Sequence, residues 1–174
     1  MSAEALLFLF ARAFHVLLAA TWVGVTAFLV FFLMPAVKDA GPGAGPLMGA
    51  LNRRNLNGFI ASIGGLAVVS GFYLYWRLTG HFDPTLSATR SAMVFGTGGI
   101  AGTIALILGG AIVSKNAKKM AVLGPRIASM PEGAERAALA AEMTAARDKT
   151  ATFGKIVLVL QVLALITMAV GHYI

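Results

Sequence analysis

Residues 5–32 read ALLFLFARAFHVLLAATWVGVTAFLVFF, and the only titratable side chains in this stretch are those of Arg12 and His15. A helix needs about 20 apolar residues to cross the hydrocarbon core of a bilayer. This stretch is therefore long enough to span a membrane and to project beyond it. Three more apolar stretches follow at residues 58–76, 91–113 and 153–173. Because a backbone in lipid must pair its own N–H and C=O groups, we expect four transmembrane helices.

The composition of the chain supports the same fold class. Of its 174 residues, 58% are hydrophobic and only 12% are charged, and the mean hydropathy is +0.81. Glu4 stands where a secretory signal would carry a basic residue, and the first apolar stretch is too long for a cleavable signal. We therefore expect an all-α, four-helix transmembrane bundle that forms a single domain over residues 1–174.

Absent residue types exclude several functions. The chain has no cysteine, which excludes disulfides, thiolate metal sites and covalent haem attachment through a CxxCH motif. The formal net charge is +7, but no basic helix with base-reading or stacking residues accompanies it, so we expect no nucleic-acid partner.

The basic residues predict the orientation in the membrane. One side holds 11 of the 14 lysines and arginines, and a side rich in these residues faces the cytoplasm. These residues are Lys38, Arg53, Arg54, Lys115, Lys118, Lys119, Arg126, Arg136, Arg147, Lys149 and Lys155. Both termini are then expected on the outer, periplasmic side of a bacterial inner (plasma) membrane.

The connections between spans carry turn and helix signals. We expect Pro35 to end the first span, and the glycines and prolines of residues 41–46 to break the helix there. Residues 115–150 form the longest polar connection, for which we predict a cytoplasmic amphipathic helix leading into the fourth span. Ser129 and Glu132 have the spacing of a capping box, and Glu132 and Arg136 that of an (i, i+4) ion pair.

All three histidines lie toward the predicted outer side: His15 in the first span, His81 in the second outer loop and His172 at the end of the fourth span. Helical spacing places His15 and His172 within two polar stripes that we expect to face the bundle interior. The stripes are Arg12, His15, Ala19, Trp22 and Thr26 on the first span, and Gln161, Leu165, Met168 and His172 on the fourth. For Gln161 we expect an interhelical hydrogen bond.

Two imidazoles at similar depth on neighbouring helices are a candidate pair of axial ligands for a b-type haem. His15 and His172 are the candidate metal and cofactor ligands, with His81 or Met168 as alternative second ligands. Arginine pairs well with carboxylates, so Arg12, Arg77 and Arg90 are candidate partners of the haem propionates. Because only two histidines lie on helices, we expect one haem per chain.

Small residues follow one face of the third span. Gly98, Gly102, Ala105 and Gly109 are spaced to share that face, with Ser62 and Gly65 on the second span. Such stripes allow helix backbones to approach closely. We predict close helix packing along this stripe.

The run Arg12-Ala13-Phe14-His15, followed after six residues by Trp22-Val23-Gly24 and then by phenylalanines and Pro35, resembles the first helix of the CopD-like and HemJ-like families. These are small bacterial membrane proteins with bundles of helices, and the resemblance covers residues 11–35. It implies haem binding and protoporphyrinogen oxidation, or periplasmic copper handling, with the family histidine at His15. The third span lacks the lysine of HemJ-like proteins, and the chain lacks a copper tract rich in methionine or histidine.

Several functions therefore stay open at this point. The leading hypothesis is electron transfer near the periplasmic face by a haem b protein, with a quinol or a periplasmic electron carrier as its redox partner, as a subunit of a respiratory complex. Such a chain is an electron carrier rather than a stand-alone enzyme. The alternatives are a cofactor-free accessory or assembly subunit held by membrane protein partners or by other copies of itself, and copper handling or porphyrin oxidation.

Overall fold

The computed structural model describes residues 2–174, and within these residues the secondary structure consists of helices and turns without strands. Four continuous helices are long and apolar enough to cross a membrane, which confirms the expected all-α, multi-span fold. They cover Ala3–Ala40, Leu56–Leu78, Arg90–Ser129 and Ala134–Val170. In detail the elements are α1 (Ala3–Phe28), a π-helical segment (Leu29–Leu33), α2 (Met34–Ala40), a 3-10 turn (Gly41–Ala44), α3 (Gly45–Arg53), α4 (Leu56–Leu78), α5 (Pro84–Ser87), α6 (Arg90–Leu108), a second π-helical segment (Gly109–Ser114), α7 (Lys115–Ser129) and α8 (Ala134–Val170).

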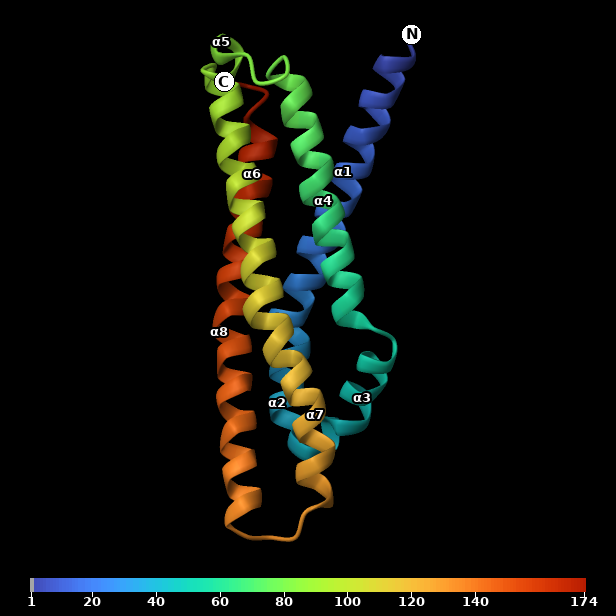
Figure 1. Cartoon of the computed structure of the whole chain (residues 1–174), viewed down its shortest axis with the longest axis vertical. Coiled ribbons are helices and arrows are strands. Elements are labelled where there is room, and N and C mark those ends of the chain that lie inside the picture. The colour runs from blue at the N-terminus through green and yellow to red at the C-terminus, as the bar shows by residue number, and fades with distance from the viewer. Residues whose placement is uncertain (1) are drawn as a thin grey trace.

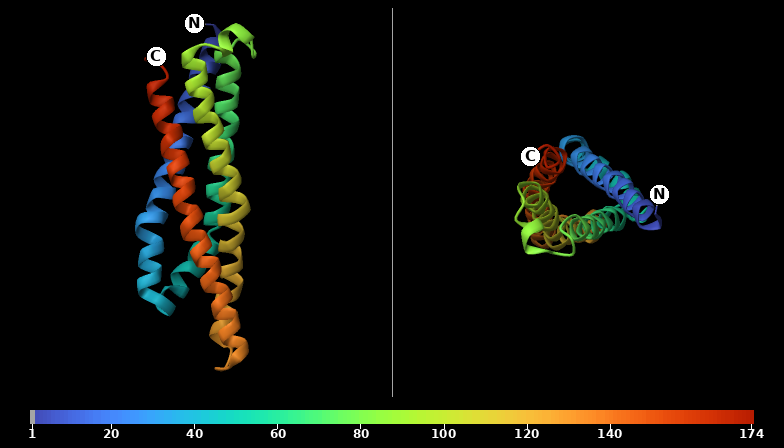
Figure 2. Two further views of the ribbon diagram at one scale, coloured as in Figure 1. Left: turned by 90° about the vertical axis from the view of Figure 1, so that its left-hand side faces the viewer. Right: turned by 90° about the horizontal axis from the view of Figure 1, so that it is seen from above.

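The helices run up and down along one long axis, so both chain termini lie at the same end of the bundle (Figure 1). We call this end, which also carries α5, the terminal end. The opposite end, with the turn at residues 130–133 between α7 and α8, is the hairpin end. α1 packs mainly on α4, and α6 mainly on α8. Viewed along its axis, the bundle has a triangular outline (Figure 2).

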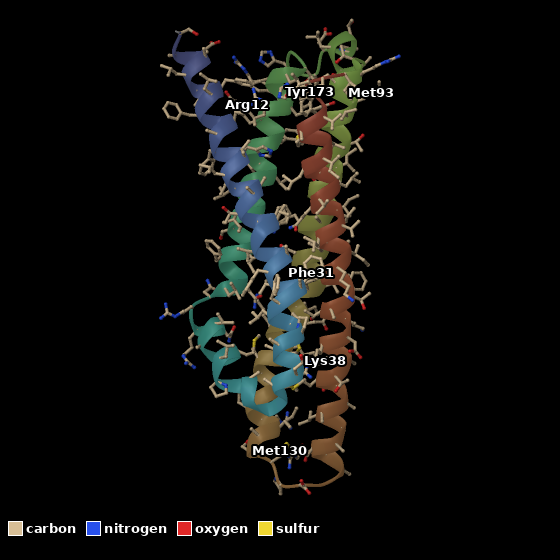
Figure 3. The ribbon with its side chains drawn as sticks, turned by 180° about the vertical axis from the view of Figure 1, so that it is seen from behind. Arg12, Phe31, Lys38, Met93, Met130 and Tyr173 are labelled. Atoms are coloured by element: carbon tan, nitrogen blue, oxygen red, sulfur yellow. The ribbon has the colours of Figure 1, made fainter. Side chains whose placement is uncertain are left out.

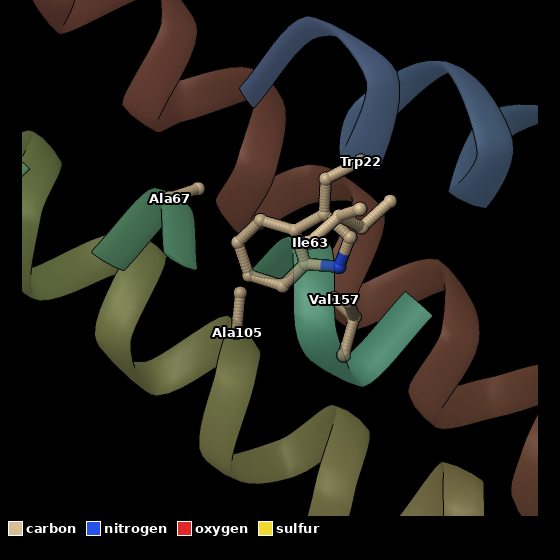
Figure 4. Close-up of a cluster of buried hydrophobic side chains, with 5 residues drawn as sticks. All are labelled: Trp22, Ile63, Ala67, Ala105 and Val157. Atoms are coloured by element: carbon tan, nitrogen blue, oxygen red, sulfur yellow. The ribbon is translucent and has the colours of Figure 1, made fainter. Parts of the chain in front are cut away.

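The core is centred on Trp22 of α1, which is only 6% exposed (Figure 4). Its indole is surrounded by small or branched side chains from the other three long helices: Ile63 and Ala67 of α4, Ala105 of α6 and Val157 of α8. A Cβ atom added at Gly64 would lie 2.7 Å from the indole ring, so glycine is what lets α4 approach it. The predicted inward face of the first span is thus confirmed at Trp22 and at the buried Thr26.

Pro35 does not end the first helix, contrary to expectation. The helix continues through it to Ala40. Proline lacks an N–H and its ring clashes with the preceding turn of an α-helix. The turn before it is widened into the π-helical segment, where the Met34 N–H donates to the Leu29 carbonyl. This wider turn accommodates the ring. The helix ends instead at Gly41, whose φ of +53° favours glycine.

The polar connection at residues 115–150 agrees with its prediction in part. The first part of α8 continues without a break into the fourth span, as expected, but a second helix, α7, precedes it. The Ser129 hydroxyl donates to the Arg126 carbonyl and ends α7, and Gly133 is the N-cap of α8, so the capping box is not formed. The predicted Glu132–Arg136 ion pair is confirmed at 3.5 Å.

The third long helix, Arg90–Ser129, has 40 residues, and α8 has 37. At about 1.5 Å per residue, each is nearly twice as long as the roughly 30 Å hydrocarbon core of a bilayer. Both helices therefore have more residues than one span needs, and α7 and the first part of α8 form a helical hairpin beyond their most apolar parts. An ion pair of 2.6 Å between Lys119 and Glu142 joins its two helices.

The small-residue stripe on α6 packs closely at Gly98. A Cβ atom there would overlap Oγ1 of Thr167, and would lie 3.1 Å from Cε of Met168 and 3.3 Å from the Ala164 carbonyl oxygen. At Gly102 and Gly109 an added Cβ would meet no atom within 4 Å. The predicted close packing therefore holds toward the terminal end of α6, where α8 lies against it, and not along the whole stripe.

Candidate functional site

His15 lies on α1 with its imidazole turned toward α4. Its Nδ1 is 2.9 Å from the Ala67 carbonyl oxygen and 3.2 Å from Oγ of Ser70. A Cβ atom added at Gly71 would lie 2.8 Å from Cε1 of the ring. The ring therefore fits against α4 because residue 71 is a glycine.

These contacts fix which ring nitrogen of His15 carries the proton. A backbone carbonyl only accepts hydrogen bonds, so Nδ1 must be the donor to Ala67. In a neutral imidazole the lone pair then lies on Nε2. Metal-ligating histidines are held in the same way, with one ring N–H donating to a backbone carbonyl and the other nitrogen left for the metal.

His172 follows the last turn of α8 and contacts two other helices. The Arg12 guanidinium of α1 donates a 2.8 Å hydrogen bond to its Nε2, so the proton of a neutral ring is on Nδ1. The ring also meets Phe95 of α6 edge-on, with the ring centroids 5.0 Å apart. The Ser91 hydroxyl donates to the Gly171 carbonyl and fastens the end of α8 to α6.

The two candidate ligands thus have different neighbours. The hydrogen bonds of His15 go to α4, whereas His172 is bonded to α1 through Arg12. Figure 3 shows α1 and α8 separating toward the end that carries Arg12 and Tyr173. The structure therefore brings Arg12 and His172 into contact across diverging helices and places His15 one turn deeper on α1.

The other candidate residues are spread over the terminal end. Arg77, at the end of α4, forms a 3.5 Å ion pair with Glu4 of α1. Arg90 is the exposed first residue of α6. His81 is exposed and its ring packs at a tilt of 39° against Trp76, with ring centroids 4.2 Å apart.

The alternative ligand Met168 lies deeper than the terminal loops, on α8. Its Cε is 3.1 Å from the position a Cβ atom of Gly98 would take. Met168 therefore packs against α6, filling the space that Gly98 leaves.

Gln161 overturns one expectation. Its side chain is 1% exposed, and within residues 2–174 neither its Nε2 nor its Oε1 has a hydrogen-bond partner. The expected interhelical hydrogen bond is therefore not formed. The predicted inward stripe of the fourth span is also interrupted, because Leu165 is 38% exposed and His172 is exposed at the end of the helix.

Sequence reasoning missed Ser70 and Gly71, which shape the surface that receives His15. A hydroxyl residue followed by glycine in an otherwise apolar span was the available signal. It did not name the histidine as the partner, because the pairing of α1 with α4 is not visible in either helix alone.

A polydentate metal site has no counterpart in the described part of the chain. Nowhere in residues 2–174 do three or more His, Asp or Glu side chains gather so that they could hold a metal ion. A haem iron, by contrast, takes only one or two axial ligands from the protein.

The chain matches no known protein-family model, no curated protein and no solved structure. The resemblance of residues 11–35 to CopD-like and HemJ-like proteins therefore stays a prediction.

Proposed function

We propose that this chain is a b-type membrane cytochrome that carries one haem at its terminal end, with His15 as an axial ligand. The observation that carries the proposal is the Nδ1 hydrogen bond of His15 to the Ala67 carbonyl. It holds the ring at a fixed angle and leaves Nε2 as the electron-pair donor. A bound haem b would supply one-electron redox chemistry.

His172 is the proposed second ligand, and Arg12 links the two histidines. Arg12 lies one helical turn from His15 and bonds Nε2 of His172. Ligation by that nitrogen requires the guanidinium to move away, and a propionate carboxylate is the stronger partner for it. Arg90, exposed at the same end, is a further propionate partner, and Arg77 would join it by exchanging its ion pair with Glu4.

The proposed orientation puts the terminal end on the periplasmic side of a bacterial inner membrane. It rests on the lysines and arginines gathered toward the hairpin end. Electrons would then pass between the terminal end and a quinol or a periplasmic carrier, and the chain would act as a subunit of a respiratory complex.

Haem content of purified variants tests the assignment of the ligand. We expect His15→Ala to lose most of the haem measured as the pyridine haemochrome, because no other imidazole is held in its place. His81→Ala is the matched control and should keep the haem of the parent chain. Equal haem in the His15→Ala variant and the parent would rule out His15 as a ligand.

A second candidate function, a cofactor-free accessory subunit, is favoured by the exposure of α1. Of the most apolar 18-residue stretch of the first long helix, only 11% is buried, against 28% of the corresponding stretch of the third long helix. Phe10 of α1 is 70% exposed, so α1 offers a wide apolar surface to a partner helix.

In-membrane photocrosslinking distinguishes this candidate from a lipid-facing helix. A photoreactive residue at Phe10 should give one discrete heavier product if α1 binds a partner. The same residue at Val69 of α4, which is 68% exposed, is the control. If neither position gives a crosslinked product, or if both give the same products, α1 does not bind a specific partner and the accessory function is ruled out for this surface.

A further inference from the structure

An apolar groove runs between α1 and α8 on the outside of the bundle. It is lined by Val23, Ala27 and Phe31 of the first long helix and by Leu158, Val159 and Val162 of α8. Phe31 is 63% exposed and Val159 68%, and Figure 3 shows Phe31 on the side where the two helices lie next to each other. All six lining residues belong to the apolar spans, so the groove opens toward lipid.

The shape of the groove favours a flexible chain over a partner helix. Its volume is about 290 Å³, below the roughly 300–1,000 Å³ of pockets that enclose a whole small molecule. It can therefore hold only a stretch of a larger ligand. Close helix packing needs small residues at the contact, and Ala27 is the single small residue of this lining.

A cation marks the end of the groove that points toward the hairpin end. Lys155 lies one helical turn before Val159 on α8 and is exposed. Val30 lies against Gly154, with its Cγ2 3.5 Å from the position of a Cβ there, which places Lys155 level with the end of the groove at Phe31. Within residues 2–174 no carboxylate lies within 4.0 Å of Lys155.

The other charges near this position lie farther toward the hairpin end. Arg147, Asp148 and Lys149 lie about two turns before Lys155 on α8, and Lys38 and Asp39 lie about two turns beyond Phe31 on α2. These five charges are of mixed sign, and none lies within the first turn beyond the groove. The charge at the mouth of the groove is therefore the ammonium group of Lys155, a point cation suited to a phosphate.

We propose that this groove is a phospholipid-binding site, with a stretch of one acyl chain against its apolar lining and the lipid phosphate on Nζ of Lys155. The two parts of the ligand match the two parts of the site. The apolar lining would contact the acyl chain within the membrane. Lys155 lies where the apolar part of α8 begins, at the level expected for a lipid phosphate. This site is independent of the haem proposal, because it involves none of the residues at the terminal end.

Native mass spectrometry of the full chain released from mild detergent tests the proposal. We expect the parent chain to keep a phospholipid adduct, identified by its mass and by the phosphorus of the extracted lipid. Lys155→Gln should lower the retained adduct several-fold, and Lys155→Arg should keep it. Lys118→Gln, at an exposed lysine on α7 remote from the groove, is the charge control and should match the parent.

A variant that fills the groove tests the apolar half of the site. Ala27→Phe should also lower the adduct several-fold, whereas Ala61→Phe, at an exposed alanine of α4, should not. Helix content from circular dichroism shows whether each variant is folded. A parent chain without phospholipid, an adduct that lacks phosphorus, a second copy of the chain in its place, or equal retention by all variants would overturn the proposal.

Discussion

The Arg12 guanidinium donates a 2.8 Å hydrogen bond to Nε2 of His172, a residue 160 positions away in the sequence. This bond joins the first and last long helices at the end where they diverge (Figure 3). It also implies that a neutral His172 ring carries its proton on Nδ1, because the guanidinium is only a donor. Its contribution to stability can be measured directly.

A double-mutant cycle of Arg12→Gln and His172→Ala should show coupling. We expect an interaction free energy of about 1 kcal/mol in unfolding experiments in detergent, the usual net value for a hydrogen bond outside the core. The same cycle with Arg90→Gln in place of Arg12→Gln is the control and should be additive, since Arg90 makes no hydrogen bond to His172 in the described chain. Additivity for Arg12 and His172 would show that the bond does not form.

Gly71→Ala should displace His15. The new Cβ would lie 2.8 Å from Cε1 of the ring, closer than such atoms approach one another. We expect a loss of about 1–3 kcal/mol in the free energy of unfolding, as for overpacking in general, together with a lower haem content. Gly65→Ala on the same helix is the control, because an added Cβ there meets no atom within 4 Å. A Gly71→Ala variant that matches it in both measurements would contradict the position of His15.

Gln161→Leu should leave the fold as stable as the parent or stabilise it. A buried polar group without a partner costs about 1–3 kcal/mol, and leucine removes that cost in a site that is almost fully closed to solvent. Gln161→Glu should be destabilising, since it buries a carboxyl group instead. Thermal unfolding in detergent provides the comparison, and a large loss of stability in the leucine variant would show that the amide has a partner after all.

Single cysteines can establish the orientation in the membrane, because the natural chain has none. Thr85→Cys, at the terminal end, should react in intact cells with a maleimide that crosses the outer but not the inner membrane. Ser129→Cys, at the hairpin end, should react only after the inner membrane is opened. Both positions are exposed. The reverse pattern would place the terminal end in the cytoplasm.

Hydropathy alone was enough to predict the four long helices. A membrane span must be apolar, and its backbone N–H and C=O groups must hydrogen-bond to one another, which a helix achieves within one segment. Helical periodicity also identified the inward face at Trp22 and Thr26. Both inferences depend on one segment at a time, and that is why they could be made without the structure.

The errors arose where two segments meet or where the backbone adapts. The helix continues past Pro35 because a neighbouring turn widens, a response that the type of residue does not reveal. The sequence also did not identify α4 as the hydrogen-bond partner of His15, because the choice of neighbour in a four-helix bundle depends on the packing of all the helices. The unpaired amide of Gln161 has the same origin, since burial alone does not supply a partner.

The central claim, that His15 holds a b-type haem, is tested most directly by the reduced-minus-oxidised absorbance spectrum of the full chain, purified from cells supplied with haem. The account predicts a b-type α-band in the parent chain that His15→Ala removes and His81→Ala leaves in place. A parent chain without that band, or a band unchanged in His15→Ala, would contradict it.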